Sequence, residues 1–390
     1  MMYIINIILV LCLCVPALYY FIFAVAGRAA RERIGVDSAV RSRFAILIPA
    51  YRSDSFIADT VRAALDQDYP EALFRVLVIS DGMQESTDAM LSGMGADVLK
   101  VEFEQSSKAA ALAAAVEHMQ GSEVQAYGNM DYVIILDSDN IVRRDFVSSM
   151  NKLLAGRHIA VQAHRRAKNM DTSVAVADAV SEEVNNLVFR AGHCALGLSS
   201  ALIGSGMAFP YGWFAGSARD FVTAGEDKEM ELRLLRDGIY VEYASGIDVL
   251  DEKTRSMENL QKQRLRWLNS QYALMGKALK GFSSVKLKAG YIDKLFQWLF
   301  PPRVLIIAGL PFVALLALLF RSAWSGCYLG CTLMLVFAFT LGKPASVGTA
   351  DVLGVFLEIP KMLINTIINI FSTGKANKGF IHTDHDENCN

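Results

Sequence analysis

The sequence predicts an α/β domain with a largely parallel sheet, set between apolar segments at the two ends of the chain. Three observations support this prediction. Of the 390 residues, 53% are hydrophobic, which is a high share for a soluble protein. The apolar excess lies in the first and last parts of the chain, whereas the charged residues lie in the middle. In that middle region short apolar runs alternate with helix-like stretches, the pattern of a parallel sheet covered by helices.

The strands of this domain are predicted from the apolar runs. They cover residues 44–48, 75–79, 98–103, 132–136 and 159–163. Helix-like segments such as Ala109–Met119 lie between them. We therefore expect one domain over residues 44–275, with helices on both faces of its sheet.

A membrane anchor is predicted over residues 1–27. Residues 2–26 form a nearly unbroken apolar run, which at about 1.5 Å per residue spans a bilayer. A cleaved signal peptide is the alternative, because Ala24–Ala26 resembles a cleavage site. No lysine or arginine precedes the run, and the run is long for a signal core, so we favour the anchor. Arginines then follow in a basic linker, residues 28–43, which the positive-inside rule places in the cytosol. They are Arg28, Arg31, Arg33, Arg41 and Arg43.

The last third of the chain returns to membrane character. Residues 304–320 and 323–341 are apolar runs separated by Arg321 and Ser322. They predict a transmembrane hairpin over residues 303–342 with both ends in the cytosol. The region before it, residues 276–302, is expected to include an interfacial helix near 287–300.

An amphipathic helix is predicted over residues 343–373. Its polar residues recur at steps of three or four, so they share one helical face opposite an apolar one. They include Asp351, Glu358, Lys361, Asn365 and Asn369. This pattern indicates a helix lying on the membrane surface. A transmembrane helix with one polar stripe is the alternative. With the interfacial helix, the tail 374–390 stays in the cytosol.

Charge and cysteine content narrow the function classes. The formal net charge of −2 gives no support for a nucleic-acid partner. The six cysteines form no pair of CxxC motifs, so we expect neither structural zinc nor disulfides. They are Cys12, Cys14, Cys327 and Cys331 in apolar runs, and the isolated Cys194 and Cys389.

Polar residues follow three of the predicted strands. These strands end in Pro49-Ala50-Tyr51, Ser80-Asp81-Gly82 and Asp137-Ser138-Asp139. Ligands bind at the carboxyl ends of the strands in an open parallel sheet, so these residues are expected at one rim. Asp137 and Asp139 share a face, and their oxygens suit Mg²⁺ or Mn²⁺ bound to a diphosphate leaving group. A lone Asp-x-Asp motif also caps turns, but Asp81 on another strand end strengthens the metal interpretation.

Further polar residues stand at the start of helical stretches. Lys108 could reach a phosphate or a nucleoside, although a solvated lysine is the plainer interpretation. Glu226 and Asp227 begin a helix whose dipole favours ionised acids, as a catalytic base requires, although such acids usually only cap the helix. The nearby Gly204-Ser205-Gly206 allows the backbone to approach a ligand closely.

Three residues of a later helical segment present one face. Gln263, Arg266 and Trp267 lie at positions i, i+3 and i+4. Arginine binds phosphate oxygens in a bidentate manner, and tryptophan stacks on a sugar ring. An arginine–tryptophan helix at a membrane interface is the alternative.

Together and in this order, these residues resemble the family 2 glycosyltransferases, especially the membrane-bound branch that includes cellulose, chitin and hyaluronan synthases. The resemblance covers residues 44–267. Its matching pieces are Ile48–Tyr51, Ser80–Gly82, Lys108 before Ala-Ala-Ala-Leu, Asp137–Asp139, Gly204–Gly206, Glu226–Asp227 and the QxxRW motif Gln263–Trp267.

The resemblance implies a GT-A fold and an inverting hexosyl transfer, mostly from a UDP-sugar. It implies that the nucleotide-sugar is held by Pro49, Ala50, Tyr51, Asp81, Lys108 and Asp137. It assigns the Mg²⁺ or Mn²⁺ ion to Asp137 and Asp139, and the role of general base to Asp227. It places on the acceptor and diphosphate side Gly206, Glu226, Gln263, Arg266 and Trp267. The tail segment Phe380–His385 loosely resembles the segment that closes over the donor site in the synthases, and a disordered tail is the alternative.

The sequence therefore predicts an integral membrane protein of a bacterial inner membrane with a cytosolic catalytic domain. It would transfer a sugar from a nucleotide-sugar to a glycan or a lipid-linked acceptor, in surface polysaccharide biosynthesis. About three membrane helices can hardly line a polymer channel. Either further copies of the chain or an export partner complete one, or no polymer is translocated.

Two other functions compete with this prediction. The first is a non-catalytic membrane protein that binds a nucleotide or a glycan and regulates a polysaccharide synthase. The complete set of acidic and QxxRW residues argues against it. The second is a nucleotidyltransferase that makes the sugar donor. It would need a glycine-rich basic loop after the first strand, where this chain has Arg52–Ser55.

Overall fold

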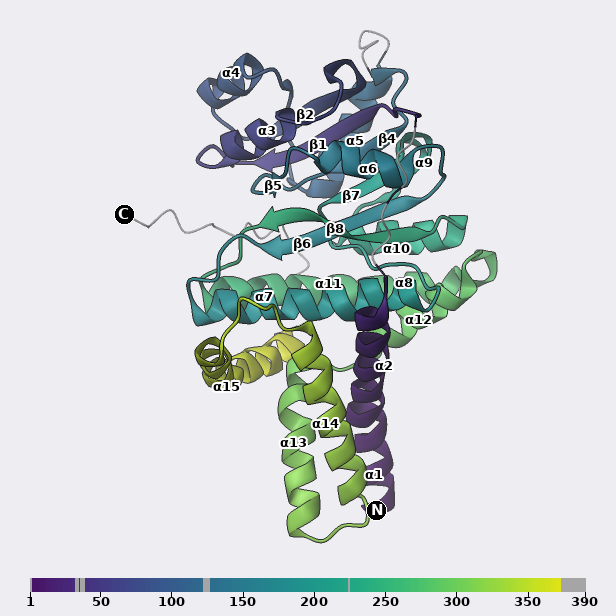
Figure 1. Ribbon diagram of the computed structural model, residues 1–390, viewed down its shortest axis with the longest axis vertical. Helices are drawn as coiled ribbons and strands as arrows, with labels where there is room; N and C mark the ends of the chain where they lie inside the picture. Colours follow the sequence, from purple (N-terminus) through teal and green to yellow (C-terminus); the bar gives the residue numbers. More distant parts are fainter. Residues whose placement is uncertain (1, 32–34, 36–38, 122–126, 224, 373–390) are drawn as a thin grey trace.

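The computed structural model describes residues 2–31, 35, 39–121, 127–223 and 225–372. They form an α/β body on a stalk of helices, with the N-terminus at the far end of the stalk (Figure 1). The tail segment Phe380–His385 lies outside the described residues.

The sheet of the body contains parallel and antiparallel neighbours. Its strands are β1 (Phe44–Tyr51), β2 (Phe74–Asp81), β3 (Asp97–Val101), β4 (Tyr132–Ile135), β5 (Ile141–Val142), β6 (Ala160–Ala167), β7 (Met207–Pro210) and β8 (Val241–Asp251). Their order is β3-β2-β1-β4-β7-β6-β8-β5. The predicted parallel half is confirmed, because β1 pairs in parallel with β2 and β4, and β2 with β3.

The expectation of a largely parallel sheet holds only in part for the other half, where β6 pairs in parallel with β8 but antiparallel neighbours also occur. The short strand β7 runs antiparallel to both β4 and β6, and β5 runs antiparallel to β8. Four-residue β7 directly follows Gly204–Gly206 and is too short to show a periodic pattern in the sequence.

Helices cover both faces of the sheet. On one face lie α3 (Ile57–Leu65), α4 (Glu85–Gly93) and α6 (Phe146–Leu154), and on the other α5 (Lys108–Gln120), α9 (Tyr211–Ser217) and α10 (Glu226–Asp237). Strand β1 shows why its sequence is a continuous apolar run. Its Phe44, Ile46 and Ile48 pack in one core, and its Ala45 and Leu47 pack in the other.

Two long helices separate the body from the stalk. They are α7 (Ser173–Asn185), which continues through η4 (Asn186–Gly192) into α8 (His193–Ala195), and α11 (Met257–Lys280). Helix α15 (Thr349–Ser372) lies beneath them and runs across the stalk rather than along it (Figure 1). Met362 of α15 packs with Val174, Leu260 and Val304, which belong to α7, α11 and α13 (Arg303–Leu319).

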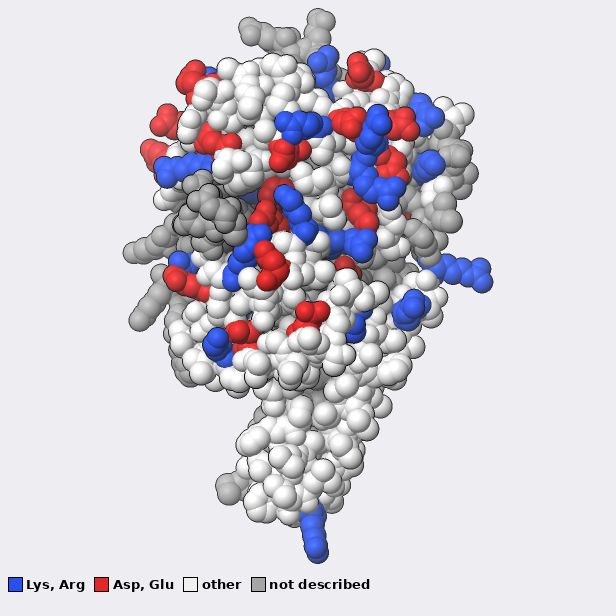
Figure 2. Space-filling model, turned by 60° about the vertical axis from the view of Figure 1, so that its left-hand side comes forward, with Lys and Arg blue, Asp and Glu red and all other residues white. Residues whose placement is uncertain are grey.

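The stalk consists of helices from both ends of the chain. They are α1 (Met2–Leu9), η1 (Val10–Cys14) and α2 (Val15–Ala29), which pack against α13 (Arg303–Leu319) and α14 (Ser325–Gly342). Figure 2 shows charged side chains over the body and an uncharged stalk surface, apart from a basic group at its far end. Arg321 lies in the turn between α13 and α14.

Among the described residues, three helices are long and apolar enough to cross a membrane: Met2–Ala29, Ser325–Gly342 and Thr349–Ile370. A fourth candidate is the bent pair of α12 (Lys288–Trp298) and α13, whose axes differ by 64°. The apolar surface of the stalk indicates a membrane association.

Two glycines bring the stalk into backbone contact with the body. A Cβ atom at Gly192 of η4 would lie 2.2 Å from the carbonyl oxygen of Phe23 in α2. A Cβ atom at Gly27 would lie 2.3 Å from the carbonyl oxygen of Leu187. Real Cβ contacts are not this short, so α2 and η4 can approach this closely only with glycine at both positions.

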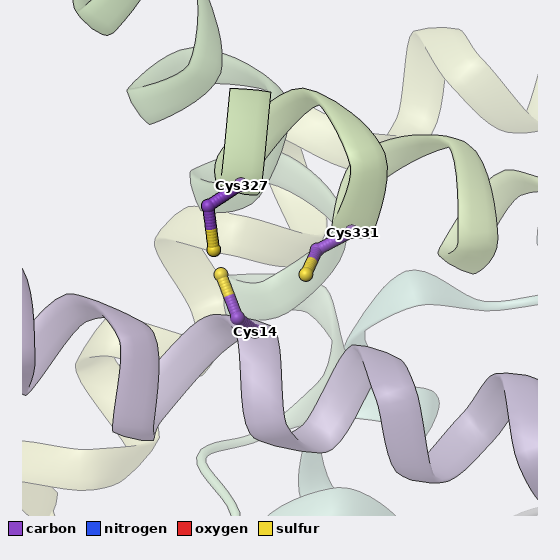
Figure 3. A group of neighbouring side chains, drawn as sticks. All are labelled: Cys14, Cys327 and Cys331. Carbon is purple, nitrogen blue, oxygen red and sulfur yellow. The ribbon is translucent and has the colours of Figure 1, made fainter. Parts of the chain in front are cut away.

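Three cysteines meet inside the stalk. Cys14 at the end of η1 faces Cys327 and Cys331 of α14, and their sulfur atoms lie within 4.8 Å of one another (Figure 3). Their spacing in the sequence did not suggest this, because Cys14 lies more than 300 residues from the other two.

Candidate active site

A cavity of about 300 Å³ opens at the carboxyl ends of β1, β2 and β4. Its walls come from the strand ends, from the starts of α5 and α10, and from α11. The structure brings together there every residue predicted for the site except Gly206. The predicted residues that line it are Pro49, Ala50, Tyr51, Asp81, Lys108, Asp137, Asp139, Glu226, Asp227, Gln263, Arg266 and Trp267.

One end of the cavity is formed by β1 and β2. Asp81 is buried, with 7% of its surface exposed, at the end of β2 beside Tyr51. Arg52 follows with a positive φ of 48°, and its backbone N–H donates to the carbonyl oxygen of Asp81. The Arg52 guanidinium lies 5.1 Å from the centre of the Tyr51 ring. This sharp turn directs the chain away from the sheet and leaves the Pro49–Tyr51 segment on the cavity wall.

Three carboxylates meet at the centre of the cavity. One oxygen from each of Asp137, Asp139 and Asp251 lies within 4.8 Å of the other two. Asn140 ties two of them together, since its side-chain NH₂ donates to Asp139 at 3.1 Å and to Asp251 at 3.3 Å. Burial, together with the charges of Asp251 and Asp137, raises the pKa of Asp139 to about 8. Crowded oxygen ligands of this kind fit a divalent cation, which would relieve their repulsion.

Asp251 was not predicted from the sequence. It ends β8, a strand with apolar residues at alternate positions at its two ends, but exposed residues at 245 and 246 interrupt the pattern. It also receives a hydrogen bond from the buried Lys253 ammonium at 2.8 Å and lies 3.6 Å from the Arg165 guanidinium. Asp251 therefore joins the acidic cluster to a buried network of ion pairs.

That network borders the cavity and comes from α7, β6, η4 and the segment after β8. Glu182 accepts hydrogen bonds from Arg165 at 2.9 Å and from Arg190 at 3.2 Å, and it lies 3.7 Å from Lys253. All four side chains are buried. These residues are not recognisable in the sequence, because charged residues are normally exposed and only tertiary contacts show which of them are paired.

Lys108 connects the acidic cluster to α10. Its ammonium contacts one carboxylate oxygen of Asp137, donates to the carbonyl oxygen of Gly204 at 2.7 Å and lies 3.9 Å from Glu226. Burial alone would lower the pKa of Lys108, but the Asp137 and Glu226 charges outweigh it and raise that pKa. Lys108 therefore stays protonated and holds positive charge inside the cavity.

The two acids at the start of α10 have different surroundings. Glu226 is 8% exposed, and burial raises its pKa to about 7 despite the attraction of Lys108. Asp227 is only partly buried and lines the cavity, where it accepts a hydrogen bond from the backbone N–H of Lys228 at 2.8 Å.

Gln263, Arg266 and Trp267 extend the wall from one face of α11. The helix begins at Met257, where Ser256 accepts a hydrogen bond from the Asn259 backbone and caps it. Trp267 is 38% exposed at the cavity mouth. The Lys228 ammonium donates to the Trp267 carbonyl oxygen at 2.9 Å and links α11 to α10.

Gly206 is not among the residues that line the cavity, whereas Gly204 is. Its N–H donates to Ile135 of β4, and its carbonyl accepts from Ala163 of β6. Gly206 has a φ of 62°, and a Cβ atom there would lie 2.9 Å from a methyl carbon of Val249. The structure therefore explains this glycine by the packing of the sheet.

An acidic cavity at the strand ends of a GT-A α/β domain defines a nucleotide-sugar-dependent glycosyltransferase. The family model "Glycosyltransferase like family 2" matches residues 42–270, more than half of the chain. The chain belongs to this family. No curated protein matches the chain.

The fold is also supported by a solved structure. The mannosyltransferase PcManGT from Pyrobaculum calidifontis, in complex with GDP-Man and Mn²⁺, has a TM-score of 0.54 at 18% identity. The match covers 84% of this chain and 93% of that protein. A Staphylococcus aureus TarS fragment in complex with UDP-GlcNAc matches at a TM-score of 0.46 and 11% identity, over 89% of this chain and 98% of the fragment.

Proposed function

We propose that the chain is a membrane-anchored, inverting glycosyltransferase of the QxxRW branch. It transfers a hexose from a nucleotide-sugar, mainly a UDP-sugar, to a glycan or a lipid-linked acceptor in surface polysaccharide biosynthesis. One observation carries the proposal. Asp137 and Asp139, Asp227, and the QxxRW face of α11 line a single cavity although they lie up to 130 residues apart in the chain.

In this proposal the donor lies along the strand ends. Pro49, Ala50, Tyr51 and Asp81 hold the nucleoside, and Lys108 with Arg266 binds the negatively charged diphosphate. Asp137 and Asp139, with Asp251 beside them, would hold a Mg²⁺ or Mn²⁺ ion. When bound, this ion supplies positive charge to the departing diphosphate. Manganese is also present in the PcManGT complex.

The reaction is a single displacement at the anomeric carbon. Asp227 takes the proton of the acceptor hydroxyl as its oxygen attacks. The new C–O bond forms while the bond to the nucleoside diphosphate breaks, and the electron pair of that bond remains on the diphosphate oxygen. Attack from the opposite side inverts the anomeric configuration, so an α-linked donor gives a β-glycoside. Trp267 frames the sugar at the cavity mouth.

The membrane arrangement is part of the proposal. The anchor 1–27 and the hairpin 303–342 cross a bacterial inner membrane, and the body lies in the cytosol. Helix α15 lies on the membrane surface, a placement supported by its direction across the stalk and its packing under α7 and α11 (Figure 1). A stalk this small favours transfer to a lipid-linked acceptor, or assembly with further copies or an export partner when the product is a polymer.

The test is nucleotide release and sugar transfer by the full chain in nanodiscs, with a panel of UDP- and GDP-sugars and Mn²⁺ or Mg²⁺. Asp227→Asn should abolish transfer. Asp220→Asn is the matched control. Asp220 is exposed and pairs with Arg233 of α10, the helix that carries Asp227, but it does not line the cavity. Transfer that survives in Asp227→Asn would exclude this base. Nucleotide binding without turnover of any donor would instead support the regulatory binding protein.

A further inference from the structure

Helix α12 lies between the catalytic helix α10 and the stalk. Its Tyr291 and Trp298 pack with Leu232 and Leu235 of α10 in one apolar cluster. The same helix bends into α13 of the stalk after Trp298. It is therefore in contact with both the α/β body and the membrane part.

A buried ion pair joins α12 to α10. The Lys294 ammonium lies 2.5 Å from a carboxylate oxygen of Glu231, and the two side chains are 8% and 6% exposed. Glu231 stands four residues after Asp227, so it lies one helical turn below the proposed base, on the same side of α10. Removing one partner of such a pair leaves a buried charge without compensation.

The neighbouring residue of α12 contacts the anchor. Asp293 accepts a hydrogen bond from the Tyr19 hydroxyl of α2 at 2.8 Å. Gln297 donates to Asp293 at 2.6 Å and accepts from Lys294 at 3.3 Å. A continuous series of polar contacts therefore runs from Tyr19 through Asp293, Gln297 and Lys294 to Glu231.

His193 completes the polar contacts at the anchor end. Its Nε2 atom lies 2.8 Å from the Tyr19 hydroxyl and 3.6 Å from Asp293. Burial, with the nearby Lys294 charge, lowers the pKa of His193 to about 3, so its ring is neutral at physiological pH. Because His193 is neutral, it offers Asp293 no positive charge. The positive charge next to Asp293 along the chain is that of Lys294, which belongs to the same helix α12.

We propose that Lys294 and Glu231 are positioning residues that hold the first turn of α10, and with it Asp227, against a helix tied to the membrane anchor through Asp293 and Tyr19. The assignment rests on the proposed role of Asp227. It explains why a charged pair is buried between two helices that apolar contacts alone could join.

The experiment compares Lys294→Met with Lys294→Arg, and with the matched control Lys277→Met, in full-length protein in nanodiscs. Lys277 lies 3.9 Å from Glu229 of the same helix α10, but it is 63% exposed. Lys294→Met should lower kcat roughly 10- to 100-fold with an unchanged KM for the donor, because a small displacement of a catalytic group has effects of this size. Lys294→Arg should restore most of the rate, and Lys277→Met should leave it within about twofold.

A second readout is independent of catalysis. Amide hydrogen exchange of residues 227–231 should be faster in Lys294→Met and in Tyr19→Phe than in the wild type and in Lys277→Met. Tyr19→Phe removes one hydrogen bond to Asp293 but leaves the Lys294–Glu231 ion pair intact, so it serves as the second variant where Lys294→Met fails to fold. Unchanged exchange and unchanged kcat in the folded variants would overturn the inference, even if their melting temperature falls. Faster exchange with unchanged kcat would overturn the positioning role as well, because the contact would then stabilise α10 without affecting catalysis, and the role of Asp227 would still be decided by Asp227→Asn.

Discussion

Replacing Gly206 by alanine separates a packing role from a ligand-binding role. With a φ of 62°, an alanine there would adopt a left-handed conformation, which costs about 1–2 kcal/mol. Its Cβ atom would lie 2.9 Å from Val249 and 3.2 Å from Ala163. Overpacking of this kind adds about 1–3 kcal/mol. The total is about 3 kcal/mol, which for a domain of this size lowers Tm by roughly 6–12 °C.

Gly204→Ala provides the matched comparison. Gly204 has a φ of 90°, but a Cβ atom there would meet only the Lys108 ammonium at 3.7 Å, an ordinary contact. This variant should lose only the conformational part, about 1–2 kcal/mol. The assay is thermal unfolding of purified protein in one detergent, followed by intrinsic fluorescence, together with donor binding below the transition.

The expected result is a clearly larger loss of Tm in Gly206→Ala than in Gly204→Ala, with donor affinity retained in the folded Gly206→Ala protein. Equal losses of Tm would refute the packing argument. Loss of donor affinity at an unchanged Tm would show that Gly206 contributes to donor binding.

Two more perturbations test the charges around the cavity. Asp139→Asn should weaken Mn²⁺ binding at least tenfold, measured by calorimetry, because it removes the negative charge of one of three clustered carboxylates. The exposed Asp59→Asn should not change it. Glu182→Gln should destabilise the protein at pH 7 by about 3–5 kcal/mol, since it removes the anion from a buried group of cations. Interactions with Arg165, Lys253 and Arg190 outweigh burial and lower the pKa of Glu182 below its usual 4.5, so its stabilisation is complete above pH 4.5 and is lost on further acidification. The Glu182→Gln variant should lack this part of the acid dependence in urea unfolding, and an equally acid-sensitive variant would contradict the assignment.

The parallel half of the fold could be predicted because both faces of its strands are buried. Residues 44–48 are fully buried, so the strand is a continuous apolar run that the sequence displays directly. Strand β8 was not predicted, because its exposed residues 245 and 246 interrupt the alternation of buried apolar residues. The pairing of β6 with β8 also shifts register between Ala163 and His164. Such an irregularity depends on the neighbouring strand, which a local pattern does not contain.

The same distinction applies to the site. Asp81, Asp137 and Asp139 were predicted because each lies within three residues of the end of an apolar run, and the carboxyl ends of parallel strands meet at one edge. Asp251 joins them only through the pairing of β8 with β6, and Glu182 meets Lys253 across 71 residues. In the sequence these residues are ordinary charges, and their partners are decided by tertiary structure. The packing of Gly206 could not be predicted for a related reason, because its close neighbour Val249 belongs to a strand that was not predicted.

The contact of Gly27 with η4 leaves no spacer between the anchor helix and the catalytic body. A body on a flexible tether changes its orientation relative to its anchor, whereas the backbone contacts at Gly27 and Gly192 hold this body in one orientation relative to α2. The cavity therefore keeps a fixed position relative to the anchor helix, which a flexible linker between the two would not provide.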